Sequence, residues 1–180
     1  MSTLCLHVPE LDELWYRKKL LEDPETMSYN RGYDIDFDGY DKETGCIAFP
    51  ESEWKNTYKY LVKNEPQWFY AYLVNAENGE LVGDVNVHKS TEHDWYEMGI
   101  VIEAKHRGKG YANEGLHLLL HHAFADMGAK AVHNDFESSR TAAIKAHEHA
   151  GFHIYKEENG IMELLITKEE FLSTEAETEA

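Results

Sequence analysis

IVIEAKHRGKGYANEGLHLLLHHAF, residues 100–124, contains three structural signals in direct succession. It opens with apolar, β-branched residues, which are typical of a buried strand. Glycines and basic residues follow and indicate a tight turn. The remainder places apolar side chains on one helical stripe, and these predicted core residues are Leu116, Leu119, Leu120, Ala123 and Phe124. We therefore predict a strand, a turn and a helix that follow one another without a linker.

The turn of this stretch has the composition of an anion-binding loop. A helix that begins directly after a turn directs free backbone N–H groups at one point, and its dipole adds partial positive charge. Glycines permit positive φ and a close approach of a ligand to the backbone, and basic side chains add charged donors. We predict a phosphate site made of Arg107, Gly108, Lys109, Gly110, Tyr111 and Ala112. The alternative is a tight turn with solvated charges. The loop is neither a Walker loop nor a GxGxxG dinucleotide fingerprint.

Composition restricts the class of protein. The 180 residues are enough for one domain with its own core. A formal charge of -17 argues against nucleic acid as a partner and would attract a cationic substrate, unless it serves solubility alone. The sequence contains no apolar run of membrane-spanning length, and we predict no export signal from its first residues. Cys5 and Cys46 form no disulfide framework, so we predict a cytoplasmic protein.

Outward from the central stretch, strands and helices alternate. We predict strands at 3–8, 67–74, 81–89, 94–102, 129–137, 153–158 and 161–166. We predict helices at 10–24, 51–64, 112–128 and 138–151. Ser52 is the expected cap of the second helix, and Ser138 or Ser139 that of the fourth. Asn159-Gly160 predicts a hairpin between the last two strands.

Two segments fall outside this pattern. Residues 27–50 are rich in Tyr, Asp and Gly without a clear period, which predicts a long structured loop. Residues 173–180 are small and acidic and predict a disordered tail after a single domain at 1–172.

Two motifs resemble the GNAT N-acetyltransferase superfamily. RGKGYA is similar to its pyrophosphate loop, (Gln/Arg)-x-x-Gly-x-(Gly/Ala), through Arg107, Gly110 and Ala112. RTAAIKAHEHAGF resembles its later helix through Ala143, Gly151 and Phe152, but differs from it at Arg140, Ala146 and His147, where the family usually has Asn, Leu and Tyr. The likeness covers roughly residues 68 to 168. The sequence is most similar to the branch that acts on ribosomal-protein N-termini and to related enzymes that act on small molecules.

The resemblance implies both a fold and a cofactor site. It implies an α/β (α+β) fold with a mixed, mostly antiparallel central sheet of about six to seven strands and helices on both faces. Acetyl-CoA would lie in a V-shaped gap between the fourth and fifth strands. The pantetheine arm would pair with the backbone of Ile100, Val101 and Ile102, where an N–H group could hold the thioester oxygen. Arg140 would bond the cofactor or simply lie near the helix start.

An amine acceptor needs a base, because an alkylamine is mostly ammonium at neutral pH. Glu97, just before the gap, is the first candidate, and a structural strand carboxylate is the equally weighted alternative. Weaker candidates are Asp84, Asn86, Asp135 and Glu137. The resemblance implies that His147, in the place of a tyrosine, protonates the departing thiolate, with helix packing as the alternative.

The loop at 27–50 is the expected acceptor contact, since aromatic faces and carboxylates suit a cation. The substrate residues that we predict there are Tyr29, Tyr33 and Asp34. A tyrosine-packed structural loop is the alternative. The run Asp34-x-Asp36-x-Asp38 is not an EF-hand, because Gly45 occupies the twelfth position. His117 and His121 have zinc-compatible spacing without an evident third ligand, so we predict no metal.

These observations predict an acetyl-CoA-dependent N-acetyltransferase. Its acceptor is predicted to be a small cationic primary amine that attacks the thioester directly. Two alternatives are acetylation of a protein N-terminus and a sensor that binds acyl-CoA without turnover. The predicted partners are acetyl-CoA and an amine, with neither nucleic acid nor membrane, and the sequence is compatible with a homodimer.

Overall fold

The structure, a computed structural model, describes residues 3–178. The first part of the chain forms β1 (Leu4–His7), the 3₁₀ turn η1 (Leu11–Leu14), α1 (Trp15–Glu22), the 3₁₀ turn η2 (Thr26–Asn30), α2 (Glu51–Thr57) and the π-helical turn η3 (Tyr58–Val62). A hairpin and the central strand follow as β2 (Trp68–Asn75), β3 (Leu81–Lys89) and β4 (Tyr96–Ile102). The rest forms η4 (Ala104–His106), α3 (Tyr111–Ala125), β5 (Ala131–Glu137), α4 (Thr141–His149), β6 (His153–Glu158), β7 (Ile161–Thr167) and α5 (Lys168–Thr178).

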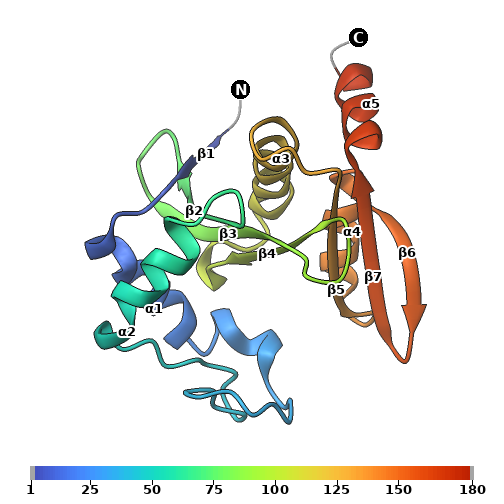
Figure 1. Ribbon diagram of the computed structural model, residues 1–180. Coiled ribbons are helices and arrows are strands. Elements are labelled where there is room, and N and C mark those ends of the chain that lie inside the picture. Colours follow the sequence, from blue (N-terminus) through green and yellow to red (C-terminus); the bar gives the residue numbers. More distant parts are fainter. Residues whose placement is uncertain (1–2, 179–180) are drawn as a thin grey trace.

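The strands form one seven-stranded sheet in the order β1-β2-β3-β4-β5-β7-β6. All neighbours pair antiparallel except β4 and β5, which are parallel. Helix α3 lies on one side of β2–β4, and α1 and α2 lie on the other (Figure 1). The predicted mixed, mostly antiparallel sheet with helices on both faces is therefore confirmed.

The parallel pair is the short one in the sheet, with only two paired positions. β4 and β5 pair only at Tyr96↔Val132 and Glu97↔His133, although both strands continue beyond these residues. β4 stays paired with β3 as far as Ile102, and β5 stays paired with β7 as far as Glu137. The two halves of the sheet thus separate after Glu97, and each keeps its own hydrogen-bond ladder on its outer side.

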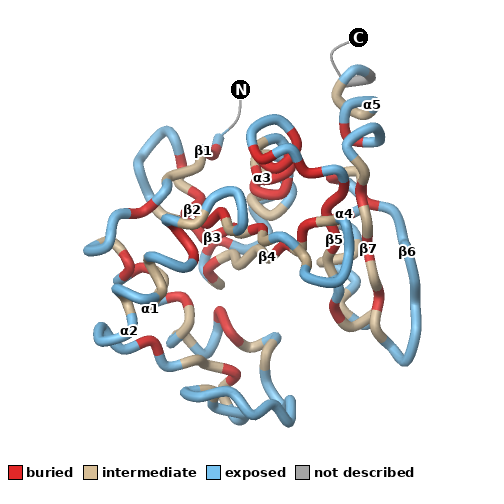
Figure 2. The backbone as a smooth tube through the Cα atoms, in the orientation of Figure 1, coloured by how far each residue is buried: buried red, intermediate tan, exposed pale blue. Residues whose placement is uncertain are grey.

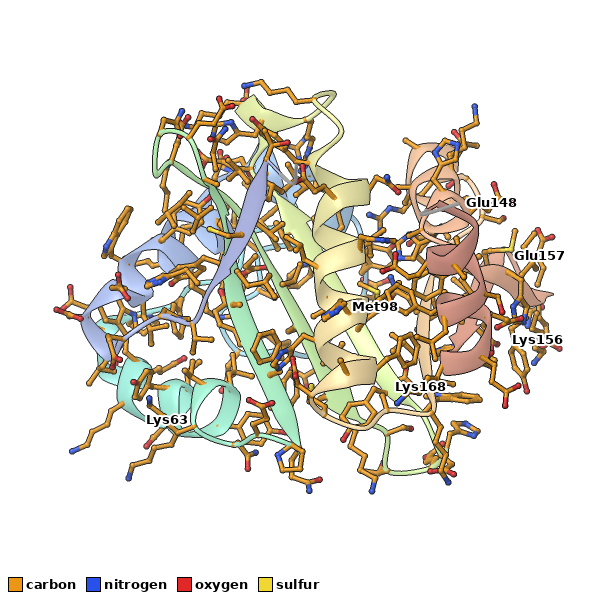
Figure 3. All side chains as sticks on the ribbon, turned by 90° about the horizontal axis from the view of Figure 1, so that it is seen from above. Lys63, Met98, Glu148, Lys156, Glu157 and Lys168 are labelled. Carbon is orange, nitrogen blue, oxygen red and sulfur yellow. The ribbon has the colours of Figure 1, made fainter. Side chains whose placement is uncertain are left out.

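Alternation along the strands gives the sheet two buried faces, because successive side chains point to opposite sides. The α3 face holds the main core, in which Met98 of β4 lies beside α3 (Figure 3). The α1 face holds a smaller cluster built around Tyr16, Tyr70 and Tyr72. Burial concentrates in β2, β3 and the inner side of α3, while β6 is exposed along its length (Figure 2). A Cβ on Gly115 would lie 2.7 Å from Leu73 Cδ1, so this glycine lets α3 pack closely on β2.

The predicted helix caps at serine are wrong. α2 begins after Pro50, which has extended backbone, and Ser52 lies inside the first turn. The cap of α4 is Arg140, without a side-chain capping bond, rather than Ser138 or Ser139. Pro50 lies before the predicted Ser52 and Arg140 lies after the predicted serines, and each has the non-helical backbone of a cap. The predicted hairpin at Asn159-Gly160 is present, with φ values of 52° and 78°.

The structure also differs from the sequence prediction at the tail. Residues 173–178 belong to helix α5 rather than to a disordered segment. Phe171, at 2% exposure, packs against Phe124 of α3, and this contact anchors the helix to the core. Residues 179–180 of the predicted tail lie outside the described residues. Within the predicted loop at 27–50, η2 and a bridge between Tyr40 and Ile47 supply local order.

Candidate active site at the split between β4 and β5

Two cavities meet where β4 and β5 separate. The first, of about 580 Å³, is bounded by the β4–α3 loop, α3 and the start of α4. The second, of about 350 Å³, lies toward α1 and β3. Both are lined by the same residues at their junction, namely Tyr29, Ile100, Val101, Arg140, Ala143 and His147. The split therefore connects a loop-and-helix cavity with a cavity on the α1 side of the sheet.

The glycines of the β4–α3 loop leave one wall of the larger cavity open. Gly108 and Gly110 have φ values of 76° and 82°, and a Cβ on either would meet no atom within 4 Å. Gly110 is the N-cap of α3, so the free N–H groups of the first helical turn start at this point. An open backbone surface at a helix N-terminus fits phosphate oxygens.

The two basic side chains of the loop contact protein groups, and their direct contact with phosphate stays a prediction. The Arg107 guanidinium donates to the carbonyl oxygens of Ile102 (3.2 Å), Glu25 (3.3 Å) and Thr26 (2.6 Å). Arg107 therefore joins the loop to η2, the turn that carries Tyr29 into both cavities. Lys109 Nζ lies 3.5 Å from His106 Nδ1, and Lys109 does not line the larger cavity. Burial lowers the pKa of His106, so the imidazole beneath the loop stays neutral.

The other predicted cofactor residues line the larger cavity: Ile100, Val101, Ile102, Arg107, Gly108, Gly110, Tyr111, Ala112 and Arg140. The Arg140 guanidinium stacks over the rings of Tyr29 (4.8 Å) and Phe136 (5.2 Å) at the junction. The stack fixes a positive charge between the two cavities. The ring contact with Tyr29 also ties η2 to the start of α4.

His147 lies at the junction with 2% exposure. Its Nδ1 lies 2.8 Å from the Ala143 carbonyl oxygen, and its Nε2 lies 2.9 Å from the Asn134 side-chain amide. These contacts require a proton on Nδ1 and a lone pair on Nε2. Burial lowers the pKa of His147, which also favours the neutral ring. Its catalytic role stays a prediction, and the geometry gives it a definite task in fixing Asn134.

A buried ionic network closes the α1 side of the smaller cavity. The Asp84 carboxylate, at 3% exposure, accepts a hydrogen bond from the Tyr70 hydroxyl (2.6 Å), and Arg17 Nη1 lies 3.6 Å away. Burial raises the pKa of Asp84, while Arg17 and Tyr70 oppose the shift. The Arg17 guanidinium also lies over the rings of Phe49 and Tyr70. The carboxylate of Asp84 therefore balances the positive charge of Arg17, and its contacts are structural.

The predicted base Glu97 is the last residue of β4 that pairs with β5 before the two strands separate. Its carboxylate accepts hydrogen bonds from the Trp95 indole (2.5 Å) and from His133 Nδ1 (2.6 Å). It lines a neighbouring cavity rather than either of the two joined ones. Both carboxylate oxygens are therefore engaged with neighbouring side chains. The catalytic role of Glu97 stays a prediction.

The remaining candidates fall into two groups. Asn86 and Asp135 line the smaller cavity, whereas Glu137 lines neither cavity. Among the predicted substrate residues, Tyr29 lines both cavities, and burial raises its pKa. Tyr33 and Asp34 line neither cavity, and Asp34 pairs with Lys42. A substrate role for those two residues stays a prediction.

Sequence reasoning missed the residues whose role depends on pairing between distant segments. These are Arg17, Trp95, His133 and Asn134. For His133 and Asn134 a signal exists, because polar residues interrupt the otherwise apolar strand AVHNDF. Arg17 carries no such signal, since it lies on a helix among other basic residues.

Within residues 3–178, no group of three or more His, Cys, Asp or Glu side chains is placed to hold a metal ion. Over the same residues, no helix combines the length and the apolar character that a bilayer crossing requires.

Comparisons with known proteins agree with this geometry. The family model described as "Acetyltransferase (GNAT) domain" matches residues 4–153. A search of curated protein sequences returned no match. Among solved structures, an acetyltransferase (GNAT family) from Bacillus anthracis is 18% identical, with a TM-score of 0.69 and coverage of 93% of this chain and 96% of that one. Spermidine N-acetyltransferase from Vibrio cholerae, solved with CoA and spermine, is also 18% identical, with a TM-score of 0.73 and coverage of 96% and 99%.

Proposed function

This chain belongs to the GNAT acetyltransferase family, and we propose that it transfers an acetyl group from acetyl-CoA to a small amine that carries positive charge. The family assignment confirms the resemblance and the predicted class of N-acetyltransferase. The substrate, the cytoplasmic location and the roles of individual residues are proposals. One observation supports the proposal above the others: two cavities of different character meet at the split between β4 and β5.

The larger cavity fits the donor acetyl-CoA. The open surface over Gly108 and Gly110 and the first turn of α3 would hold its phosphates, and the free edge of β4 at Ile100, Val101 and Ile102 would pair with its pantetheine arm. When bound, acetyl-CoA supplies the acetyl group, whose carbonyl carbon forms a C–N bond with the amine as its C–S bond breaks. The backbone N–H groups of β4 that face the split are the donors available to a developing oxyanion.

The smaller cavity would hold the amine. The attacking nitrogen must lose a proton, since only the neutral amine has a free lone pair. We propose Asp135 as the group that receives this proton, directly or through water. Asp135 is exposed, and no side chain among residues 3–178 donates to its carboxylate. Glu97, in contrast, already accepts two hydrogen bonds.

The experiment is an assay of thiol release from acetyl-CoA with a panel of acceptors. The panel contains cationic monoamines, diamines, amino-acid amides and short peptides with a free N-terminus. Turnover with small cationic amines and little turnover with peptides is the expected result. Faster turnover of the peptides would mean that the acceptor is a protein N-terminus rather than a small amine. Tight binding of acetyl-CoA without turnover of any acceptor would contradict an enzymatic function and indicate a sensor.

A further inference from the structure

A further cavity, of about 380 Å³, lies beside the proposed acceptor cavity. It is lined by the turn between β3 and β4 and by residues of β4, β5 and β7. Asp135 lines both cavities, so they are neighbours at the split of the sheet. We name this space the side cavity.

Carboxylates from three successive strands of the sheet converge on the side cavity. They come from Glu97 on β4, Asp135 on β5 and Glu163 on β7. The register pairs Asp135 with Glu163 and Glu97 with His133, which places all these side chains on one face of the sheet. The basic groups nearby are Lys89 in the wall and Lys156, whose Nζ lies 4.0 Å from Glu163 Oε1. Carboxylates therefore outnumber ammonium groups in this space.

His133 supplies an independent sign that a donor belongs in the side cavity. Its exposure is 6%, and its Nδ1 lies 2.6 Å from Glu97 Oε2. Its Nε2 is buried and has no hydrogen-bond partner among residues 3–178. Glu163 Oε2 lies 3.5 Å from that nitrogen. In the tautomer that donates to Glu97, two acceptors therefore face each other without a proton between them.

Aromatic rings complete the walls. The Trp95 ring stacks on His133 (4.9 Å, 18°) and on His93 (4.1 Å, 20°). Tyr155 meets the Trp95 ring edge-on at 5.7 Å. These contacts hold the Trp95 ring in the cavity wall, where it offers apolar surface to a methylene chain. An alkylammonium group combines the features that this lining selects, with N–H donors for His133 and Glu163, positive charge for the carboxylates and a methylene chain for the rings.

We propose that the side cavity binds a second ammonium group of the acceptor, and that the preferred substrate is a linear diamine or polyamine. This inference rests on the proposed function. Attack on the acetyl group beside Ile100 places the first nitrogen in the acceptor cavity, and Glu97 lies three residues earlier on the same strand, about 10 Å away by the rise of a strand. The two nitrogens of the substrate must therefore be separated by a chain of several methylene groups.

The test compares linear diamines of increasing length with n-alkyl monoamines of the same length. We expect the kcat/KM of a sufficiently long diamine to exceed that of its matched monoamine by at least about tenfold. Glu163→Gln should lower this ratio about tenfold, and Trp95→Leu should lower it as well. The matched control is Glu157→Gln. Glu157 pairs with Met162, the neighbour of Glu163 in β7, and so lies on the opposite face of the sheet from Glu163. The variant Glu157→Gln should leave the ratio of diamine to monoamine kcat/KM unchanged.

Calorimetry of the protein saturated with CoA separates this inference from the proposed function. In one outcome the parent binds long diamines selectively, with weaker binding in Glu163→Gln, and yet releases no thiol. That result would support the side cavity as a diamine site and contradict the enzymatic function. Equal affinities for diamines and monoamines would overturn the assignment of the side cavity as a site for the second ammonium group. Circular dichroism of each variant shows that the comparison is made on folded protein.

Discussion

The two sides of the split differ in how they are built. The proposed cofactor side consists of one continuous segment, β4, its loop and α3, with the start of α4 beside it. The proposed acceptor side brings together α1, η2, β3 and β5, whose residues are far apart in the chain. The first depends on backbone geometry and the second on buried side-chain networks. The comparison teaches that one side of an active site can follow from local sequence while the other follows only from the assembled fold.

The largest effect is expected on the cofactor side. Gly110→Glu would place a carboxylate against the phosphates of CoA, and like charges about 4 Å apart repel by about 4 kcal/mol near a protein surface. We expect CoA affinity to fall about 1,000-fold, measured by calorimetry.

Gly128→Glu is the matched control for Gly110→Glu. Both glycines have positive φ, 82° and 72°, and a Cβ on either meets no atom within 4 Å. The backbone strain of the two variants is thus similar, about 1–2 kcal/mol. Gly128 follows the far end of α3, so its variant should lose stability and keep CoA affinity. Unchanged affinity in Gly110→Glu would remove the loop from the cofactor site.

On the proposed acceptor side, the next largest effect is expected on the free energy of unfolding. Asp84→Asn keeps the shape of the side chain but leaves Arg17 without its compensating charge. Removal of one partner from a buried pair costs about 3 kcal/mol or more, and urea unfolding measures it. Asp94→Asn, in the exposed pair with Lys130, should leave the midpoint unchanged. If Asp84→Asn were as stable as the parent, Asp84 would be neutral in the folded protein.

Turnover tests which carboxylate faces the attacking amine. Loss of a general base lowers kcat by about 100-fold or more, and we expect this of Asp135→Asn. Glu97→Gln should mainly raise the KM for diamines, because its carboxylate lies in the side cavity. The reverse pattern, with the kcat loss in Glu97→Gln, would make Glu97, the first candidate of the sequence analysis, the general base.

The sequence predicted most of the fold because its signals are local. The run of strands, the helix after the RGKGYA loop and the Asn159-Gly160 hairpin all depend on residues within one or two turns. The turn before α3 also follows from a local signal, and its cofactor role stays a prediction. Helix α5 was missed, since its start depends on burial of Phe171 against α3, a contact that no local pattern contains.

The acceptor side could not be predicted to the same depth. Register decides which strand residues share a face, and a shift of one residue reverses every side chain. His133 meets Glu97 only because β4 and β5 pair at that residue and nowhere beyond it. Arg17 reaches Asp84 across the sheet face from α1, so its role follows from packing rather than from spacing.

His147 lies between the two sides, and its variant should have the smallest effect. His147→Phe keeps an aromatic ring but leaves the Asn134 amide and the Ala143 carbonyl without their partner. Loss of such bonds costs about 1–3 kcal/mol. Because burial lowers the pKa of His147, the folded state holds fewer protons than the unfolded state below about pH 6.5. The parent should therefore lose stability as the pH falls through this range.

The pH dependence separates His147 from other histidines of the same helix. The variant His147→Phe lacks the titrating group, so its stability should fall less steeply below about pH 6.5 than that of the parent. His149→Phe, at an exposed position of α4, should follow the parent curve. Thermal unfolding at several pH values provides the measurement. Parallel curves for His147→Phe and the parent would mean that the buried ring accepts a proton, and a protonated His147 at the junction could then act as the acid toward the thiolate.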